Sequence, residues 1–117
     1  MSYNFPPHIK ANYEFLNKLS KTRSDRKKHS LLLQATPDQI LSIVEICANI
    51  LRSNFVLTTK QKTRLAQYAD YYRAIARSRT EKTARNRIQQ GGQIAIATLL
   101  APVLSAVAQT LLDRVIK

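Results

Sequence analysis

Apolar side chains recur every three or four residues along most of this chain, which is the spacing of one face of an α-helix. From about residue 9 to residue 21 the spacing is carried by Tyr13, Leu16 and Leu19. A polar stretch at 21–28 predicts a turn that leads into a second helical segment ending at 31–33. No run of strictly alternating apolar and polar residues predicts a β-strand.

Three later segments open with helix start signals. The stretch 36–39 combines a Thr cap, a proline at the first helical position and a glutamine three residues after the cap. A wide apolar stripe follows over 40–51 and predicts a central, buried helix. The Thr-x-x-Gln form at 58–61 predicts a helix that continues to Ala76, and Ser-x-x-Glu at 78–81 predicts a short basic helix to Gln90.

The end of the chain is apolar. Residues 94–112 carry no charge, and Pro102 lies at the middle of this segment. We expect a helical tail broken at Pro102 that packs on the domain or in a homo-oligomer. The length alone permits a membrane span, which the Ala, Pro and hydroxyl content disfavours, and a segment lying in a bilayer surface is a third alternative.

The predicted fold is therefore all-α, a small bundle of four to six helices with an apolar C-terminal helical tail. With 117 residues the chain is of single-domain size. We divide it into an irregular lead-in at 1–8, a basic helical domain at 9–90, and a Gly-Gly linker with the apolar tail at 91–117. Residues 1–16 hold no apolar run typical of a signal peptide, which predicts a protein that is intracellular when made.

Charge is large and unevenly placed. The chain has 19 Lys and Arg against 7 Asp and Glu, a net charge of +12. Residues 59–92 hold nine basic and two acidic side chains, so 9 − 2 = +7 falls in this block, whereas 1–58 carries +4 and 93–117 carries +1. A located excess of this size indicates a polyanionic partner.

Composition excludes several functional classes. The two glycines are too few for a Gly-rich phosphate loop, and Cys47 stands alone, without a partner for a disulfide or a cysteine metal site. His8 and His29 have no ligand cluster near them in the sequence. We therefore expect no enzyme, no metal and no cofactor.

The basic block contains the candidate nucleic-acid-binding residues. Arg73 and Arg77 lie one helical turn apart, and Arg79, Lys82 and Arg85 lie three apart, so both sets form rows that fit phosphates. No recognition-helix pattern is evident, so binding to the backbone without base readout is expected. The predicted phosphate-binding residues are Lys60, Lys62, Arg64, Arg73, Arg77, Arg79, Lys82, Arg85 and Arg87.

Tyrosines accompany this block. Tyr68 and Tyr72, four residues apart, are interpreted as part of the helix core stripe, which leaves Tyr71 as the exposed candidate for base stacking. Gly91 and Gly92 are the only glycines and mark the boundary between basic block and apolar tail. They favour a helix C-cap with one left-handed glycine, an exposed processing point, or both.

The stretch from Arg85 to Ala108, in which basic sequence ends in Gly91-Gly92 and an apolar Ile/Ala/Leu/Pro segment follows, resembles the end of the adenovirus core-protein precursor pX. The front and middle of the chain resemble small basic proteins of adintoviruses and Polinton/Maverick elements. The matching order is Ala35-Thr36-Pro37, Glu45-Ile46-Cys47, Asn49-Ile50-Leu51, Leu57-Thr58 and Gln61-Lys62.

This resemblance implies a protein that accompanies packaged double-stranded DNA, in a virion core or the host nucleus. It also implies a viral cysteine protease as partner, which would cut between Gly92 and Gln93 and separate the basic segment from the tail. The chain departs from the adenovirus peptide in its folded front and in a basic segment diluted by Ala, Thr and Gln.

Two functional hypotheses follow from the sequence. The first is a DNA-binding core or packaging protein of a virus or virus-like mobile element. The second is a membrane-active or membrane-anchored protein, in which residues 94–112 meet an intracellular, anionic membrane. A helical adaptor for an acidic protein is a third and weaker hypothesis.

Overall fold

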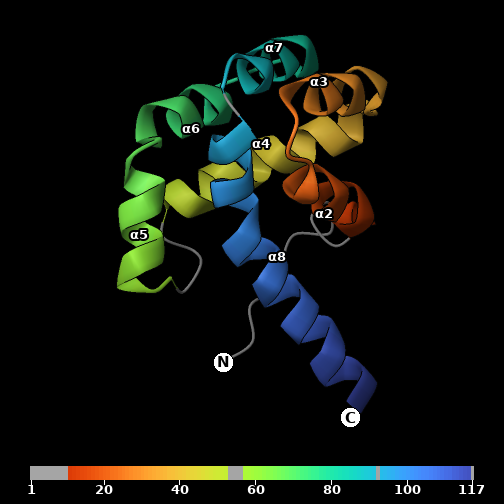
Figure 1. Ribbon diagram of the computed structural model, residues 1–117, viewed down its shortest axis with the longest axis vertical. Coiled ribbons are helices and arrows are strands. Elements are labelled where there is room, and N and C mark those ends of the chain that lie inside the picture. The colour runs from red at the N-terminus through yellow and green to blue at the C-terminus, as the bar shows by residue number, and fades with distance from the viewer. Residues whose placement is uncertain (1–10, 53–56, 92, 117) are drawn as a thin grey trace.

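The computed structural model describes residues 11–52, 57–91 and 93–116, with side chains as far as residue 105. These residues form seven α-helices and no strand (Figure 1), which confirms the all-α prediction. The helices are α2 (Tyr13–Lys21), α3 (Asp25–Gln34), α4 (Pro37–Leu51), α5 (Thr59–Ala66), α6 (Ala69–Ala76), α7 (Glu81–Gln90) and α8 (Gln93–Ile116).

The predicted start signals of α4 and α5 are confirmed as capping boxes. The Thr36 hydroxyl accepts from the Gln39 backbone N–H at 3.2 Å, and the Gln39 side chain accepts from the Thr36 N–H at 2.9 Å. Thr58 and Gln61 repeat this exchange at 3.1 and 2.9 Å. Each box satisfies two backbone donors that a helix N-terminus leaves unpaired.

The predicted start of α7 is wrong by two residues. Thr80, not Ser78, is the N-cap, and its hydroxyl accepts from the Thr83 N–H at 3.1 Å. The Ser78 hydroxyl instead donates to the Ala74 carbonyl at 3.3 Å, at the end of α6. Ser78 and Thr80 are both close enough in sequence to cap α7, but Ser78 binds the end of α6 and Thr80 caps α7.

The described residues contain six helices before the apolar tail, and α8 is the tail helix itself. The predicted helix from 59 to 76 is divided by a turn at Gln67 and Tyr68 into α5 and α6. The division has a packing cause. The α5 helix packs on α8, whereas α6 packs on α4 and α7, and one straight helix would not reach both sets of partners.

One hydrophobic core joins α4, in the middle of the bundle, to the first half of α8. The α8 helix packs on α2 and α5, and α4 packs on α6 and α7 (Figure 1). The core residues with no exposed surface are Leu16, Leu19, Leu32, Ile40, Ile43, Ile46, Cys47, Ile75, Ala84, Ile88, Ile96, Leu99, Leu100 and Val103. The first part of the apolar tail is therefore a component of the core.

The predicted break at Pro102 is wrong, because α8 continues through this residue without interruption. Proline lacks the N–H that would bond to the carbonyl of Thr98, so the helix loses one bond at this turn. On the adjoining turns Leu99, Leu100 and Val103 are fully buried. Their burial offsets the lost hydrogen bond and keeps the helix intact.

The far end of α8 extends beyond the other described helices (Figure 1). Within the described residues no single helix has the length and apolar content of a membrane span. The pair α3 and α4, bent by 118°, meets that standard only when both helices are taken together and only by length and composition.

We predict that Pro102→Ala stabilises the protein and that Pro37→Ala does not. Alanine restores the N–H at residue 102, so the free energy of unfolding should rise by about 1 to 3 kcal/mol in chemical denaturation. Pro37 is at the first turn of α4, where its N–H would have no intrahelical acceptor. Equal effects of the two substitutions would contradict this account of α8.

Candidate nucleic-acid interface

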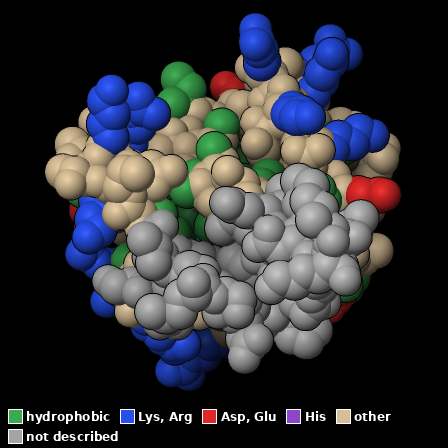
Figure 2. Space-filling view, turned by 90° about the horizontal axis from the view of Figure 1, so that it is seen from below, with side chains coloured by type: hydrophobic (Ala, Val, Ile, Leu, Met, Phe, Trp, Pro, Cys, Tyr) green, Lys and Arg blue, Asp and Glu red, His purple; other side chains and the backbone are tan. Residues whose placement is uncertain are grey.

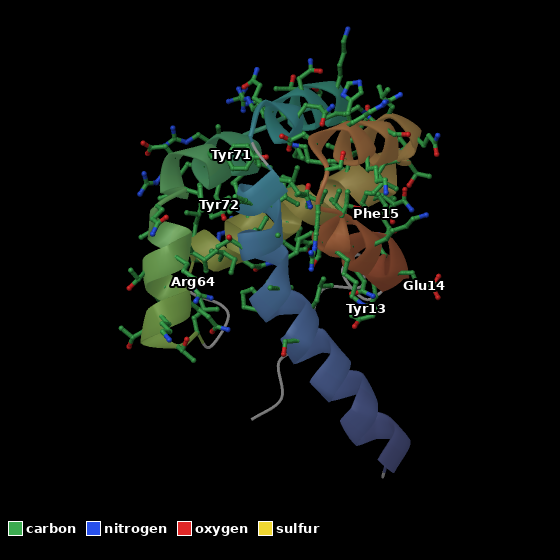
Figure 3. The ribbon with its side chains drawn as sticks, in the orientation of Figure 1. Tyr13, Glu14, Phe15, Arg64, Tyr71 and Tyr72 are labelled. Atoms are coloured by element: carbon green, nitrogen blue, oxygen red, sulfur yellow. The ribbon has the colours of Figure 1, made fainter. Side chains whose placement is uncertain are left out.

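Most of the predicted phosphate-binding residues have exposed side chains. They are distributed over α5, α6, the following turn and the first turn of α7 rather than along one helix (Figure 3). The exposed members of the predicted set are Lys60, Lys62, Arg64, Arg73, Arg77, Arg79 and Lys82. All seven can meet phosphate from solvent.

Arg73 differs from the other exposed members because it has an acidic neighbour. Its guanidinium donates to Asp70, one helical turn away, at 2.8 Å, and both side chains lie at the surface. An exposed pair of this kind contributes about 0 to 1 kcal/mol to stability and is weakened by salt. Phosphate can therefore displace Asp70 at small cost.

Arg85 does not belong to the interface. Its side chain is 20% exposed and donates to the Leu32 carbonyl, to the Ala35 carbonyl at 2.9 Å, and to the Glu81 carboxylate. Leu32 and Ala35 are at the C-terminal end of α3, where carbonyl groups lack intrahelical donors. The predicted row of Arg79, Lys82 and Arg85 is therefore broken, because Arg85 caps α3.

Arg87 is also turned inward, so its assignment as a phosphate-binding residue is wrong as well. Its guanidinium donates to the Ala74 carbonyl at 2.6 Å and to the Ser78 hydroxyl at 3.3 Å. Ala74 lies in the last turn of α6. Two arginines of α7 thus cap the C-termini of two other helices, a use of cations that the negative end of the helix dipole favours.

A second group of exposed cations was missed by the sequence reasoning. Lys18 and Lys21 lie on α2, Arg23 on the connection, and Arg26 and Lys27 on α3. The signal was present, because residues 21–28 contain five basic side chains and one acidic one. We expected a polar turn there, whereas residues 22–24 form the turn and residues 25–28 already form the start of α3.

The cations of α5 and those of α2 lie on different sides of the molecule, whereas Lys82 lies on α7, which packs on α3. The α5 helix and the α2–α3 hairpin flank α8 from opposite sides (Figure 1). Seen from below, Lys and Arg side chains form separate groups around the edge of the visible surface (Figure 2). The arrangement offers several contacts to a polyanion rather than a single groove.

Tyr71 is not an exposed stacking residue. It lies between α6 and the α7–α8 junction (Figure 3), and its hydroxyl donates to the Ile88 carbonyl. Its ring packs against the ring of Tyr72, and the two ring centroids are 5.8 Å apart. Burial raises the pKa of the Tyr71 phenol above its ordinary value, and the nearby Cys47 and Tyr72 add to the shift. The interpretation of Tyr72 as a core residue is confirmed, since it is 1% exposed.

Gly91 is needed for space and not for its backbone angles. The α7 helix ends at Gly91 with φ −88° and ψ 154°, which is extended backbone, so Gly91 is not the left-handed glycine of the expected cap. A Cβ at this position would overlap the ring of Tyr71. The close approach of ring and backbone is what requires glycine here. Gly92, the other predicted boundary residue, lies outside the described residues.

The residues on either side of Gly92 are held by hydrogen bonds with α2 and α3. The buried ammonium of Lys28 donates to the Gly91 carbonyl, and the Asp25 carboxylate accepts from the Gln93 N–H at 3.0 Å. The Gln93 side chain, 7% exposed, donates to the Leu19 carbonyl at 2.7 Å. The expectation of an exposed processing point is therefore not matched at Gly91 and Gln93, and cleavage at 92–93 would require these contacts to open.

Lys28 is a buried cation at this junction. It is 2% exposed, and desolvation lowers the pKa of its ammonium, although Asp25 at 3.9 Å acts in the opposite direction. Its bond to the carbonyl of Gly91 satisfies the end of α7. Lys28 is thus the third cation in the described residues that serves as a helix cap.

Neither the one described cysteine nor the described acidic and histidine residues form a second candidate site. Cys47 is buried, and desolvation raises the pKa of its thiol, so the reactive thiolate is disfavoured. No group of three His, Cys, Asp or Glu side chains with metal-binding geometry occurs among them.

Comparison with protein-family models, curated proteins and solved structures finds no match to this chain.

We predict that Arg85→Ala lowers the stability of the protein, whereas Lys82→Ala, also on α7, lowers its affinity for DNA. Arg85→Ala leaves the Ala35 carbonyl unpaired and leaves the Leu32 carbonyl only its 3.4 Å bond from the Ala35 N–H, so it should lower the free energy of unfolding by about 1 to 3 kcal/mol. Lys82→Ala should leave stability within about 0.5 kcal/mol and weaken binding to duplex DNA. Denaturation curves and a binding titration on both variants test this. If Arg85→Ala is as stable as the wild type but binds DNA more weakly, Arg85 contacts DNA, and its assignment as a cap of α3 is contradicted.

We predict that Gly91→Ala destabilises the protein, because the new methyl group overlaps the ring of Tyr71. The expected loss is about 1 to 3 kcal/mol, as for other overpacked sites. Gln90→Ala, at the adjacent exposed position, is the matched control and should have little effect. Thermal unfolding of the two variants distinguishes a need for space from a general sensitivity of the junction.

Proposed function

We propose that this protein binds the phosphate backbone of nucleic acid, with double-stranded DNA as the principal ligand, and that it does so without reading base sequence. The observation that supports the proposal most is the imbalance of exposed charge. In the described residues the exposed cations occur on α2, α3, α5, α6 and α7 and in the turns beside them, whereas the exposed acids are Glu14, Asp25, Asp38 and Asp70.

The few acids leave most of the cations without local neutralisation. Asp25 faces the backbone of Gln93, Asp70 pairs with Arg73, and the half-buried Glu81 binds Arg85. The α5 helix carries Lys60, Lys62 and Arg64 and no acidic residue. Such side chains release condensed counterions when they meet phosphates, which is the main source of sequence-independent affinity.

The biological setting that we propose is that of a non-enzymatic core or packaging protein of a virus or virus-like mobile element. This part of the proposal is supported by the resemblance to adenovirus-like core proteins, with a location in the virion core or the host nucleus. Processing at 92–93 by a viral cysteine protease belongs to the same proposal. The contacts of Gly91 and Gln93 imply that it would act on an opened junction.

An anionic membrane is the second candidate partner. The observation that favours it is the end of α8, which extends beyond the other described helices (Figure 1) and whose sequence is uncharged as far as Leu112. Self-association through the same end would make a homo-oligomer. Because Ile96, Leu99 and Leu100 are buried in the core, the first half of the 94–112 segment is not accessible to a membrane or to a second copy of the chain.

We predict that replacement of Lys60, Lys62 and Arg64 by Gln reduces the salt dependence of duplex DNA binding. If the three side chains meet three phosphates, the slope of log affinity against log salt should fall in magnitude by about 2 to 3. Fluorescence anisotropy with a labelled duplex over a range of salt concentrations measures it. Unchanged far-ultraviolet circular dichroism would show that the variant remains folded.

Affinity for duplex DNA that is insensitive to salt would contradict the proposal. Binding of anionic vesicles but not of duplex would support the membrane candidate instead, and a variant with Leu111 and Leu112 changed to Ser should then lose the vesicles. Under the nucleic-acid proposal the same variant keeps its affinity for DNA.

A further inference from the structure

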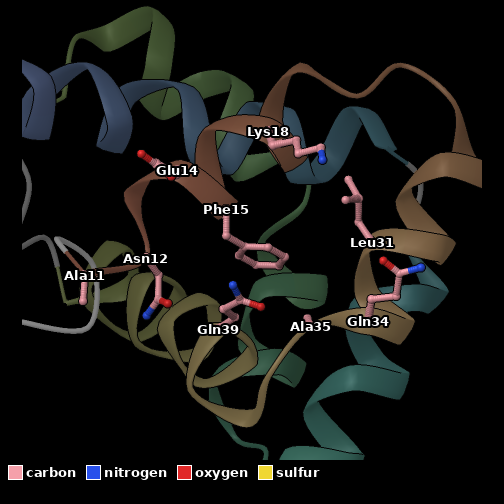
Figure 4. Close-up of a pocket in the computed structure, with 9 residues that line it drawn as sticks. All are labelled: Ala11, Asn12, Glu14, Phe15, Lys18, Leu31, Gln34, Ala35 and Gln39. Carbon is pink, nitrogen blue, oxygen red and sulfur yellow. The ribbon is translucent and has the colours of Figure 1, made fainter.

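A pocket of about 400 Å³ lies where α2 and α3 meet the start of α4 (Figure 4). Phe15 is the one aromatic residue among those that line the pocket, and its ring points from α2 into it. The other lining residues are Ala11, Asn12, Glu14, Lys18, Leu31, Gln34, Ala35 and Gln39.

The floor of this pocket is apolar and the ring in it is accessible. Phe15 is half-buried and packs against the core with one part of its side chain. Leu31 and Ala35, on α3 and at its end, complete the apolar lining. The volume is at the lower end of those of ligand pockets, so a flat group the size of one nucleobase fits it better than a large ligand.

The rim of the pocket can form hydrogen bonds. Gln34 is exposed at the end of α3, with an amide that carries both donors and an acceptor. Figure 4 shows its side chain at the side of the pocket opposite Phe15. Gln39 is fixed, because its amide oxygen is held by the Thr36 N–H in the capping box. An amide at the edge of a stacking platform matches the donor and acceptor pair of an adenine edge.

Both helices that line the pocket, α2 and α3, also carry exposed lysine side chains. On α2, Lys18 lines the pocket together with Glu14, whereas Lys21, one turn later, lines a separate pocket beside Gln93 and Ile94 of α8. On α3, the exposed Lys27 precedes Leu31 by one turn and therefore lies on the same side of the helix. The cations next to this aromatic pocket are thus Lys18, which lines it, and Lys27, on the same side of α3 as Leu31.

We propose that this pocket takes one unpaired base of a nucleic-acid strand. The base stacks on Phe15, its edge meets the amide of Gln34, and the flanking phosphates lie on Lys18 and Lys27. A cationic track beside an aromatic platform is how proteins bind single strands. The inference rests on the proposed nucleic-acid function and adds a site for single-stranded regions. An apolar side chain of a peptide would also fit the floor, but the flanking cations favour a phosphate-bearing ligand.

The test compares Phe15→Leu with Phe15→Tyr on a labelled single-stranded oligodeoxyadenylate and on a duplex. Leucine keeps the apolar cover of the core and removes the ring, whereas tyrosine keeps the ring. We expect Phe15→Leu to weaken single-strand binding about tenfold, to leave duplex binding unchanged, and Phe15→Tyr to retain wild-type affinity. A 2-aminopurine in the strand should be quenched by the wild-type protein and not by Phe15→Leu.

A second variant separates the pocket from general electrostatics. Arg64→Gln, on the opposite side of the molecule, should weaken the single strand and the duplex to the same extent. Equal single-strand affinity and equal quenching for wild type and Phe15→Leu would overturn the inference while leaving the proposed function intact. Failure of the wild-type protein to bind either nucleic acid would overturn both. Phe15-dependent binding of an acidic, leucine-containing peptide without base quenching would assign the pocket to a peptide.

Discussion

The α3 and α7 helices of this bundle each end on a cation that the other supplies. Lys28 of α3 donates to the Gly91 carbonyl at the end of α7, and Arg85 of α7 donates to the Leu32 and Ala35 carbonyls at the end of α3. The last carbonyls of a helix lack intrahelical donors and form the negative end of its dipole, so a partly buried cation is well placed there. This reciprocal capping fixes the α7–α8 junction, and with it the path by which α8 enters the core.

The basic side chains of this protein therefore have two roles: some cap helices inside the bundle, and others are exposed at the surface. Lys28, Arg85 and Arg87 are structural, because each satisfies carbonyls inside the bundle. The remaining cations of the described residues are left to solvent or to a polyanion. Charge that looks continuous in the sequence is therefore discontinuous in space, and net charge by itself overstates the surface available to phosphate.

Aromatic side chains are divided in a similar way. Tyr71, next to the basic block in sequence, is held against Gly91 and Ile88, because its ring fills the space that the missing Cβ of a glycine leaves. Phe15 has the apolar spacing of a core residue, yet its ring borders a pocket where two helices diverge. Helical periodicity assigns a side chain to a face, but it does not say whether a neighbouring helix covers all of that face.

Local chemistry was enough to determine the helical class of this protein, the capping boxes that start α4 and α5, and the membership of α4 in the core. These features depend on residues within a few positions of one another, so the sequence contains all the interacting partners. Tertiary structure alone decided that α8 continues through Pro102, that Gly91 must lack a side chain, and that Arg85 and Arg87 point inward. Each of these depends on contacts with residues far away in the chain, such as the carbonyl of Leu32, 53 positions from Arg85, and no local pattern records such a partner.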